Sequence, residues 1–378
     1  MRVLVTDPVS LTMNLGGLKS LTIVRFPRWR RYLLEPLLRG IYSEWAISFD
    51  RTSGAGETVA VSRTLVWAGM ANPADTAAAD VRMEDGFIRS VGLGSDLIRP
   101  QSVVLDGRGI YFDATRPSDL EVLLNEQAFT PNELSEAVAV REFIVAHGIT
   151  KYNLEPNEPI DFSGVAGDRP VVLVPGQVED DASIALGCTG IRTNLQLLKA
   201  VRAARPHAYV VYKPHPDVVS GNRRGRLAVS SARQYADWVE TKASIVGCIA
   251  ACDELHTMTS LSGFDALLRG KRVVTYGQPF YAGWGLTEDC CQDGPAFVRR
   301  TRRLSLDELV AGALLKYPIY WDWDLKGYTT CMAVLHRIVE ERSALEANGG
   351  LHKLRVGWLR RQWRKAGVLV RAYGLGGG

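Results

Sequence analysis

Short apolar runs alternate with amphipathic stretches along this 378-residue chain, most clearly in its second half. Four runs that end in turn residues predict buried strands there: PVVLVPGQ, AYVVYKPHP, ELHTMTS and KRVVTYG. Between them, residues 193–206 predict a helix, because Thr193 and Gln196 have the spacing of a capping box. Residues 261–270 predict a second helix that ends at Gly270. Strands that alternate with helices indicate an α/β fold with parallel sheets.

The first half shows the same alternation more weakly. The stretches TLVWAG and SVVLDGRG predict strands, and SDLEVLLNE predicts a helix with Ser118 as its N-cap. Residues 151–170 are rich in Pro, Gly, Asn and Asp, which indicates a domain boundary. We therefore expect four segments: an unassigned segment 1–60, two domains at 61–160 and 161–330 whose strand ends face a common cleft, and C-terminal helices at 331–378.

Composition narrows the class of protein. Apolar residues make up 46% and charged residues 23% of the chain, as in soluble globular proteins, and a net charge of +4 does not indicate a nucleic-acid binder. The six cysteines match no zinc spacing and indicate reduced thiols in a cytosolic protein. No signal peptide or membrane-spanning run is evident.

An acidic loop follows the first strand of the second half. The sequence GQVEDDAS places Glu179, Asp180 and Asp181 side by side. Crowded carboxylates raise one another's pKa values, so such a cluster is costly unless it is used. It is either a reactive loop or a solvated acidic turn.

The next strand ends in Lys-Pro-His-Pro. Proline cannot continue a strand ladder, so we expect a rigid corner that presents Lys213 and His215 outward. Both side chains suit a phosphate, and His215 can also protonate a leaving oxygen. The alternative is a plain strand exit at the surface.

Two further motifs follow strands in the second half. Ser260, Ser262 and Gly263 lie where a helix begins, a place that favours an anion, unless Ser260 is only a helix cap. The loop 276–287 interleaves Phe280, Tyr281 and Trp284 with glycines, so it either stacks on a base or sugar or plugs the domain core.

Two other stretches stand apart from these strand ends. In the first half, Glu84 and Asp85 precede a glycine at a turn, and the nearby GLGSD does not open a dinucleotide-binding unit. Residues 352–374 carry seven basic residues and no acid, with Trp358 and Trp363 among them. Such a helix favours an anionic membrane surface, although it can also pack its tryptophans on the domain.

Long blocks of this sequence resemble the KpsC/LipB family of capsule polysaccharide proteins. The blocks are VPGQVEDDASI, YKPHPDV, TSLSGFDALLRGKRVVTYGQPFYAGWGLT and MEDGFIRSVGLGSDLIRPQSVVLDGRGIYFDATRPSDLE, the last with Met83 where the family has valine. The similarity covers about residues 60–330 in order. It implies a GT-B-like fold of two Rossmann-like domains and a retaining β-Kdo glycosyltransferase. Such enzymes use CMP-Kdo to build an oligo-Kdo linker on a lipid anchor. Many relatives carry two modules, and this chain resembles one.

The resemblance also implies roles for individual residues. Asp181 corresponds to the nucleophile, with Asp180 a weaker choice, and Glu84 or Asp85 would be the base for the acceptor hydroxyl, by analogy with bacterial sialyltransferases. Donor-binding residues would be Gln177, Lys213, His215, Ser260, Ser262, Gly263 and Asp265, the last on the ribose. We expect no metal, because the DWD triplet at 322–324 lies outside these motifs.

The expected partners follow from the same reading. They are CMP-Kdo, a lipid-linked Kdo acceptor, the anionic cytoplasmic face of the inner membrane and other capsule assembly proteins. Two rivals stay open: a transferase for another CMP-linked ulosonic acid, and a non-catalytic assembly or export factor that binds a sugar nucleotide without turnover.

Overall fold

The chain divides into two compact units. The computed structural model describes residues 19–50, 61–69, 73–93, 96–154, 159–215, 218, 227–350 and 358–374. Unit 1 comprises Met1–Ile110, Ile149–Leu154 and Ala313–Gly378, and unit 2 comprises Tyr111–Gly148 and Glu155–Gly312. The cleft expected between two domains stays a prediction.

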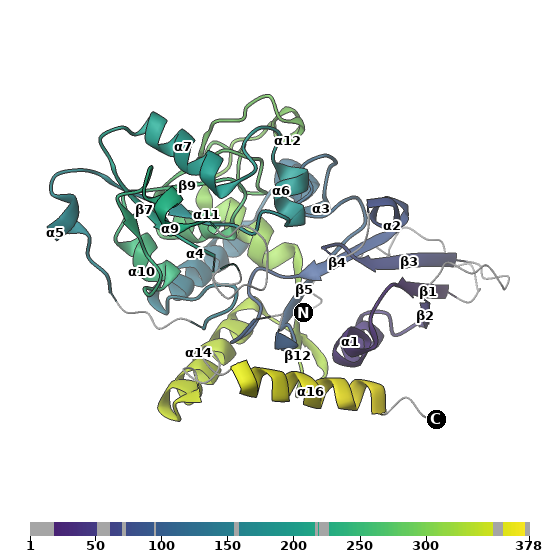
Figure 1. The fold of residues 1–378 in the computed structure, drawn as a ribbon. Coiled ribbons are helices and arrows are strands. Elements are labelled where there is room, and N and C mark those ends of the chain that lie inside the picture. The colour runs from purple at the N-terminus through teal and green to yellow at the C-terminus, as the bar shows by residue number, and fades with distance from the viewer. Residues whose placement is uncertain are drawn as a thin grey trace. The chain divides into compact units, whose positions relative to one another are not determined.

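Unit 1 is built on a seven-stranded sheet in the order β13-β12-β5-β4-β3-β1-β2 (Figure 1). Its strands are β1 (Lys19–Val24), β2 (Trp45–Asp50), β3 (Val61–Trp67), β4 (Val81–Asp85), β5 (Ser102–Asp106), β12 (Pro318–Asp322) and β13 (Gly327–Thr329). Its helices are α1 (Arg28–Ile41), α2 (Pro73–Ala78), α14 (Cys331–Ala347) and α16 (Trp358–Gly374).

Segment 1–60, which the sequence left unassigned, supplies β1, α1 and β2. Leu21 and Ile23 of β1 alternate into the core of unit 1, and leucines of α1, such as Leu37, pack on the same face of the sheet. Strands β1 to β4 are parallel.

The prediction of a parallel strand at 102–109 is wrong in direction, because β5 runs antiparallel to β4. A parallel return needs a crossover, usually a helix, and the described part of 86–101 forms turns instead. Strand β12 then adds antiparallel to β5. Unit 1 therefore takes residues 318–322 from the segment expected to close the second domain, and the units are discontinuous in sequence.

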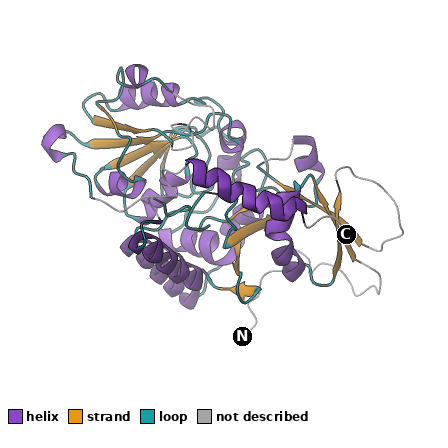
Figure 2. Ribbon diagram, turned by 60° about the horizontal axis from the view of Figure 1, so that its bottom comes forward, coloured by secondary structure: helices purple, strands orange, loops and turns teal. Residues whose placement is uncertain are grey.

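Unit 2 holds a six-stranded, wholly parallel sheet in the order β11-β10-β9-β6-β7-β8, flanked by helices (Figure 2). Its strands are β6 (Val171–Pro175), β7 (Tyr209–Lys213), β8 (Trp238–Val239), β9 (Glu254–Thr257), β10 (Arg272–Thr275) and β11 (Glu288–Asp289). The chain runs outward from β6 to β8, then returns to β9 on the other side of β6. The carboxyl ends of β6 and β9 therefore form the switch point where open α/β sheets bind ligands.

The helices of unit 2 confirm the predicted end signals. They are α3 (Asp119–Glu126), α4 (Pro131–Ala146), α5 (Ser163–Ala166), α6 (Ala182–Gly187), α7 (Asn194–Ala204), α9 (Val229–Ala232), α10 (Ile245–Ala250), α11 (Leu261–Leu268), α12 (Pro295–Arg299) and α13 (Leu306–Val310), and a π-helical segment, Ala311–Lys316, leads out of the unit. Ser118 caps α3, Thr193 and Gln196 form the capping box of α7, and Gly270 follows α11 at φ 70°.

Candidate functional site

The loops after β6 and β9 are joined at the switch point by Gln177. Its Oε1 accepts hydrogen bonds from Thr257 Oγ1 (3.1 Å) and Thr259 N (3.0 Å), and its Nε2 donates to Thr259 Oγ1 (3.0 Å). Asn194, the first residue of α7, exchanges two more bonds with the Gln177 backbone. Gln177 is buried. In the structure it holds two loops of the site, and its contact with a donor stays a prediction.

The loop after β6 also lies against the Lys-Pro-His-Pro corner after β7. Gly176 N donates to Lys213 O (2.7 Å), and a Cβ on Gly176 would lie 3.2 Å from both His215 N and Pro214 Cα. A side chain at position 176 would therefore push the two loops apart, which accounts for the glycine. The structure thus brings the acidic loop, the corner and the start of α11 to one edge of the sheet, as predicted.

Asp181 is partly exposed at this edge and caps α6. Its Oδ1 accepts a hydrogen bond from Ser183 N (3.0 Å), and Ser183 Oγ in turn accepts one from Thr259 Oγ1 (3.3 Å). Glu179 accepts from Asn194 N at the start of α7 (2.7 Å). Two of the three crowded carboxylates therefore face helix amino termini, which stabilise negative charge. Asp180 is the exposed one.

The expectation that Lys213 points outward is wrong. Lys213 ends β7, all of whose residues are buried, and its Nζ donates to Ala243 O at 2.5 Å. Burial acts to raise the pKa of Glu240, but hydrogen bonds from backbone amides lower it, and the Lys213 charge adds to this lowering. Side chains alternate along a strand, and position 213 faces this loop rather than the solvent. His215 is partly exposed, so it is the polar side chain of the corner that a ligand can reach.

Ser260 and Ser262 are partly exposed at the start of α11. Ser260 is its N-cap and accepts from Ser262 N (3.2 Å), and the two hydroxyls lie 3.2 Å apart. The structure gives Gly263 a packing role, and its contact with a donor stays a prediction. A Cβ there would lie 2.2 Å from the hydroxyl oxygen of Tyr281, which donates to Ser260 O at 2.5 Å. Gly263 makes room for a tyrosine that supports the helix start.

Asp265 lies one turn further along α11 and is buried. Burial raises the pKa of its carboxyl to about 6, and the Arg269 guanidinium, 3.9 Å away, opposes that rise. A carboxyl with this pKa changes charge near neutral pH. The assignment of Asp265 to a ribose stays a prediction.

The aromatic loop 276–287 is a plug in the core of unit 2. Phe280, Tyr281 and Trp284 are each at most 6% exposed. Arg300 holds the loop in place through Nη1, which donates to Pro279 O (2.6 Å) and Ala282 O (2.7 Å). These contacts resolve the choice left open by the sequence, because buried rings do not stack on a ligand.

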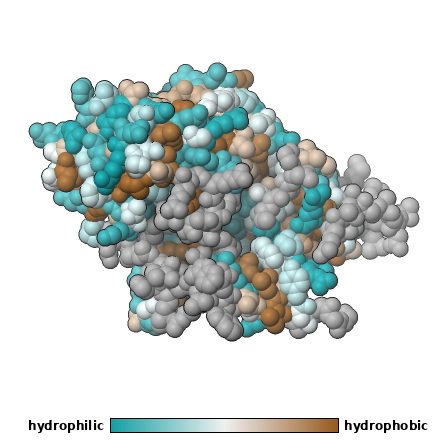
Figure 3. Space-filling model, in the orientation of Figure 1, coloured by the Kyte–Doolittle hydropathy of each residue, from teal (hydrophilic) through white to brown (hydrophobic). Residues whose placement is uncertain are grey.

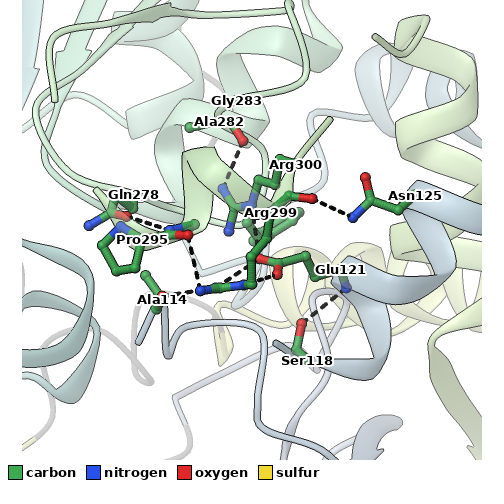
Figure 4. A network of polar contacts seen from close by, with 12 residues as sticks. Ala114, Ser118, Glu121, Asn125, Gln278, Ala282, Gly283, Pro295, Arg299 and Arg300 are labelled. Carbon is green, nitrogen blue, oxygen red and sulfur yellow. Dashed lines mark hydrogen bonds and ion pairs between the residues drawn. The ribbon is translucent and has the colours of Figure 1, made fainter. Parts of the chain in front are cut away.

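Arg300 belongs to a buried network around Glu121 (Figure 4). Glu121, on α3, accepts from Arg300 Nε (3.1 Å) and from Arg299, which also donates to Ala114 O (2.9 Å). Asn125 Nδ2 donates to Arg299 O. The arginines of the stretch 299–303 look alike in the sequence. The sequence therefore does not show that Arg299 and Arg300 belong to this network.

Unit 1 carries Glu84 and Asp85 at the end of β4. Glu84 accepts from Gly69 N (2.9 Å) and Asp85 N (3.1 Å). Burial and the negative charge of Asp85 raise the pKa of Glu84 to about 7. Asp85 is buried and paired with Arg89 (2.7 Å). A pKa of about 7 suits Glu84 to act as a general base near neutral pH.

Several predicted features lie elsewhere. Asp322 and Asp324 of the DWD triplet both pair with Arg337. Within the described part of the chain, no group of three or more His, Cys, Asp or Glu side chains is arranged to hold a metal. Pro216 after the corner, Gly94, and the tryptophan side chains of the basic tail lie outside the described residues.

Comparison with known proteins places these features in a family. Residues 70–320 match the family described as "Capsule polysaccharide biosynthesis protein". The chain is 47% identical over 273 residues to "Capsule polysaccharide modification protein LipA" of Neisseria meningitidis serogroup B, a match that covers 72% of this chain and 38% of LipA. "Lipopolysaccharide-processing protein LpsZ" of Rhizobium meliloti is 43% identical over 241 residues, 63% of this chain and 54% of LpsZ. The chain thus spans well under two thirds of each curated relative.

Two solved structures are similar over most of the chain. "Thermosulfurimonas dismutans KpsC, beta Kdo 2,7 transferase" is 34% identical with a TM-score of 0.68, covering 85% of this chain and 99% of that one. "Thermosulfurimonas dismutans KpsC, beta Kdo 2,4 transferase" is 30% identical with a TM-score of 0.71, covering 84% and 98%. The resemblance and the GT-B-like fold class expected from the sequence are confirmed. The chain belongs to the capsule polysaccharide biosynthesis protein family, and it is related to the KpsC Kdo transferases.

Proposed function

We propose that this chain is a glycosyltransferase that moves the sugar acid Kdo from CMP-Kdo to a Kdo-bearing lipid acceptor during capsule assembly. The observation that carries the proposal is the 34% identity to a KpsC β-Kdo transferase over 85% of the chain. The convergence of Asp181, His215 and Ser260 loops at the switch point of unit 2 supports it. The donor needs no metal in this scheme, because His215 and the start of α11 take the leaving phosphate.

The reaction proceeds with retention in two displacements. A carboxylate oxygen of Asp181 attacks the anomeric carbon of Kdo, and the bond from that carbon to the CMP phosphate oxygen breaks. CMP leaves with the electron pair of that bond. The acceptor hydroxyl oxygen then attacks the same carbon, its proton passes to Glu84, and Asp181 is released.

Product analysis tests this function directly. Purified protein is given CMP-Kdo and a synthetic lipid carrying a terminal Kdo, and the products are read by mass spectrometry. The proposal requires CMP release together with an acceptor that gains Kdo, and both should slow in His215→Ala. Transfer from CMP-sialic acid alone would identify another ulosonic acid as the donor. CMP binding without any transfer would identify a non-catalytic factor.

Replacing Glu84 with Gln should slow transfer and remove the pH dependence that Glu84 gives to the stability of the fold. A general base contributes roughly 100-fold or more. The wild-type rate should rise with pH to a plateau above about 7, the pKa of Glu84, and the variant should lack this rise. The measurement is the transfer rate across the pH range, with donor and acceptor saturating.

Ionisation of Glu84 makes the unfolding free energy of wild type depend on pH. The folded pKa of about 7 exceeds the usual 4.5, so between these values the folded protein keeps a proton that the unfolded chain has released. The free energy of unfolding of wild type therefore falls as pH rises through this window, whereas Gln cannot ionise. Urea unfolding between about pH 5 and pH 8 should show a fall in the unfolding free energy of wild type that Glu84→Gln lacks, and equal pH dependence of the two would contradict the assignment.

We also propose that the basic tail attaches the protein to the anionic cytoplasmic face of the inner membrane, where other capsule assembly proteins would meet it. Within the described residues no helix has the length and apolar character to cross a bilayer. Helix α16 packs on α1, and Val368 reaches the core of unit 1. Its end exposes Val370 and Tyr373. Apolar and hydrophilic residues lie side by side on the face of the molecule drawn in Figure 3.

Changing Arg360, Arg361 and Arg364 to Gln should weaken binding to phosphatidylglycerol vesicles by roughly 100-fold, since each basic residue contributes about 1 kcal/mol near such a surface. Vesicle sedimentation at low and high salt measures it, and phosphatidylcholine vesicles are the control. This variant is preferred to deletion of residues after 350, because deletion would also remove Val368 from the core. Undiminished sedimentation would exclude an electrostatic role of the tail.

A further inference from the structure

The hydrogen bonds of Gln177 fix the direction in which its side-chain amide points. Thr259 N can only donate, and it donates to Gln177 Oε1 at 3.0 Å. Thr257 Oγ1 accepts from Ser260 N (3.2 Å), and its own hydrogen also goes to Gln177 Oε1 (3.1 Å). The oxygen of the amide is therefore the acceptor between these partners. The other end of the amide, Nε2, donates to Thr259 Oγ1 at 3.0 Å.

This direction passes along two hydroxyl groups. A hydroxyl group has one hydrogen to donate, and it accepts at its lone pairs. Thr259 Oγ1 accepts from the amide, and its hydrogen goes to Ser183 Oγ, 3.3 Å away. Ser183 thus accepts from Thr259 and keeps its own hydrogen to donate elsewhere. Among the described residues none accepts that hydrogen, and Ser183 is partly exposed at the switch point.

The hydroxyl of Ser183 lies close to the candidate nucleophile. Ser183 is in the first turn of α6, two positions after Asp181, and its backbone amide donates to Asp181 Oδ1 (3.0 Å). A sugar whose anomeric carbon is seated at Asp181 therefore brings its anionic oxygens within reach of Ser183. In CMP-Kdo these oxygens belong to the carboxylate on the anomeric carbon and to the phosphate joined to that carbon. Hydrogen bonds to an ionised acceptor are among the stronger ones.

We propose that Ser183 donates a hydrogen bond to an anionic oxygen of the donor, and that Thr259 is a positioning residue that sets this direction. Gln177 makes Thr259 an acceptor, so Thr259 donates to Ser183, and Ser183 donates to the ligand. Without Thr259 Oγ1 the hydroxyl of Ser183 turns freely and loses this orientation. The inference deepens the proposed function and rests on it. The anionic oxygen belongs either to the carboxylate of the sugar or to the phosphate of CMP.

Donor binding tests this chain of hydrogen bonds apart from transfer. CMP-Kdo and CMP are titrated by calorimetry into full-length Asp181→Asn protein, the parent, which keeps the cap of α6 but cannot form the covalent intermediate. In this parent, Ser183→Ala should weaken CMP-Kdo binding at least about tenfold, the range for a hydrogen bond to a charged group. Thr259→Val, which keeps the shape of threonine, should weaken it about threefold to tenfold, and Thr259→Ser should restore it.

A double variant distinguishes positioning from structural support. If Thr259 acts through Ser183, then Thr259→Val should cause no further loss once Ser183 is replaced with Ala. The control is Thr189→Val, at an exposed threonine whose hydroxyl contacts Cys291 Sγ (2.9 Å), and it should bind as the parent does. Equal losses from Thr259→Val with and without the Ser183 hydroxyl would show structural support only and overturn the positioning role. Unchanged affinity in Ser183→Ala would overturn the whole inference.

The two ligands separate the sources of the anionic oxygen. If it belongs to the carboxylate, only CMP-Kdo binding should depend on Ser183 and Thr259. If it belongs to the phosphate, CMP binding should fall by the same factor. Absence of CMP-Kdo binding to the parent would overturn the inference together with the proposed function. Binding as predicted, in a protein whose wild type transfers no Kdo, would refute the proposed function alone.

Discussion

An Asp181→Asn variant is expected to lose Kdo transfer by three or more orders of magnitude, roughly the loss seen when a nucleophile is removed, while keeping its fold. Asp181 is partly exposed at the switch-point edge, and its Oδ1 already accepts from Ser183 N. Asn preserves this cap because its side-chain oxygen accepts the same bond, but an amide cannot attack the anomeric carbon. The readout is the rate of CMP release from CMP-Kdo with acceptor present.

Two companion variants separate chemistry from capping. Asp181→Ala removes both the nucleophile and the cap, and so should also lose about 1 kcal/mol of unfolding free energy. Asp180→Asn changes the exposed neighbour and should transfer nearly as wild type. Transfer near the wild-type rate in Asp181→Asn would show that Asp181 serves only to start α6.

Local signals in the sequence predict most of the helices and strands of unit 2. Strands β6 and β7 are continuous, largely apolar runs, and residues such as Ser118, Thr193 and Gly270 start or end helices through bonds to neighbours a few positions away. Such signals are visible without knowledge of the fold. The placement of the motifs at one edge follows as well, because loops after parallel strands meet at the same side of a sheet.

These local signals do not predict the direction in which a side chain points. Lys213 turns to Ala243 O, thirty residues on, and Gly263 is needed for Tyr281, which arrives from a different loop. Unit 1 shows the same limit at a larger scale. Strand β12 joins β5 across more than 200 residues, and β1 lies between β3 and β2 although it comes from a segment with no recognisable pattern. Contacts between distant segments are settled by packing, which spacing along the chain does not encode.

A Glu121→Gln variant is expected to destabilise unit 2 by about 3–5 kcal/mol, the range for removing one partner of a buried ion pair. Burial lowers the pKa of Arg300, and the charge of Glu121 and its hydrogen bond to Arg300 oppose that fall. Neutral Gln keeps the shape of Glu121 but leaves Arg300, whose side chain is 3% exposed, without its counter-charge. Urea unfolding, followed by circular dichroism, gives the change in unfolding free energy.

The same variant should also weaken donor binding, because a chain of contacts links Arg300 to the start of α11. Arg300 holds the carbonyls of Pro279 and Ala282, which flank Tyr281, and Tyr281 donates to Ser260 O at the start of α11. The matched control is Asp307→Asn, which breaks the partly exposed pair with Arg141 and should change the unfolding free energy by at most about 1 kcal/mol. A loss in Glu121→Gln no larger than in this control would mean that the two carbonyls alone hold Arg300, and the Glu121 charge would then have no part in shaping the site.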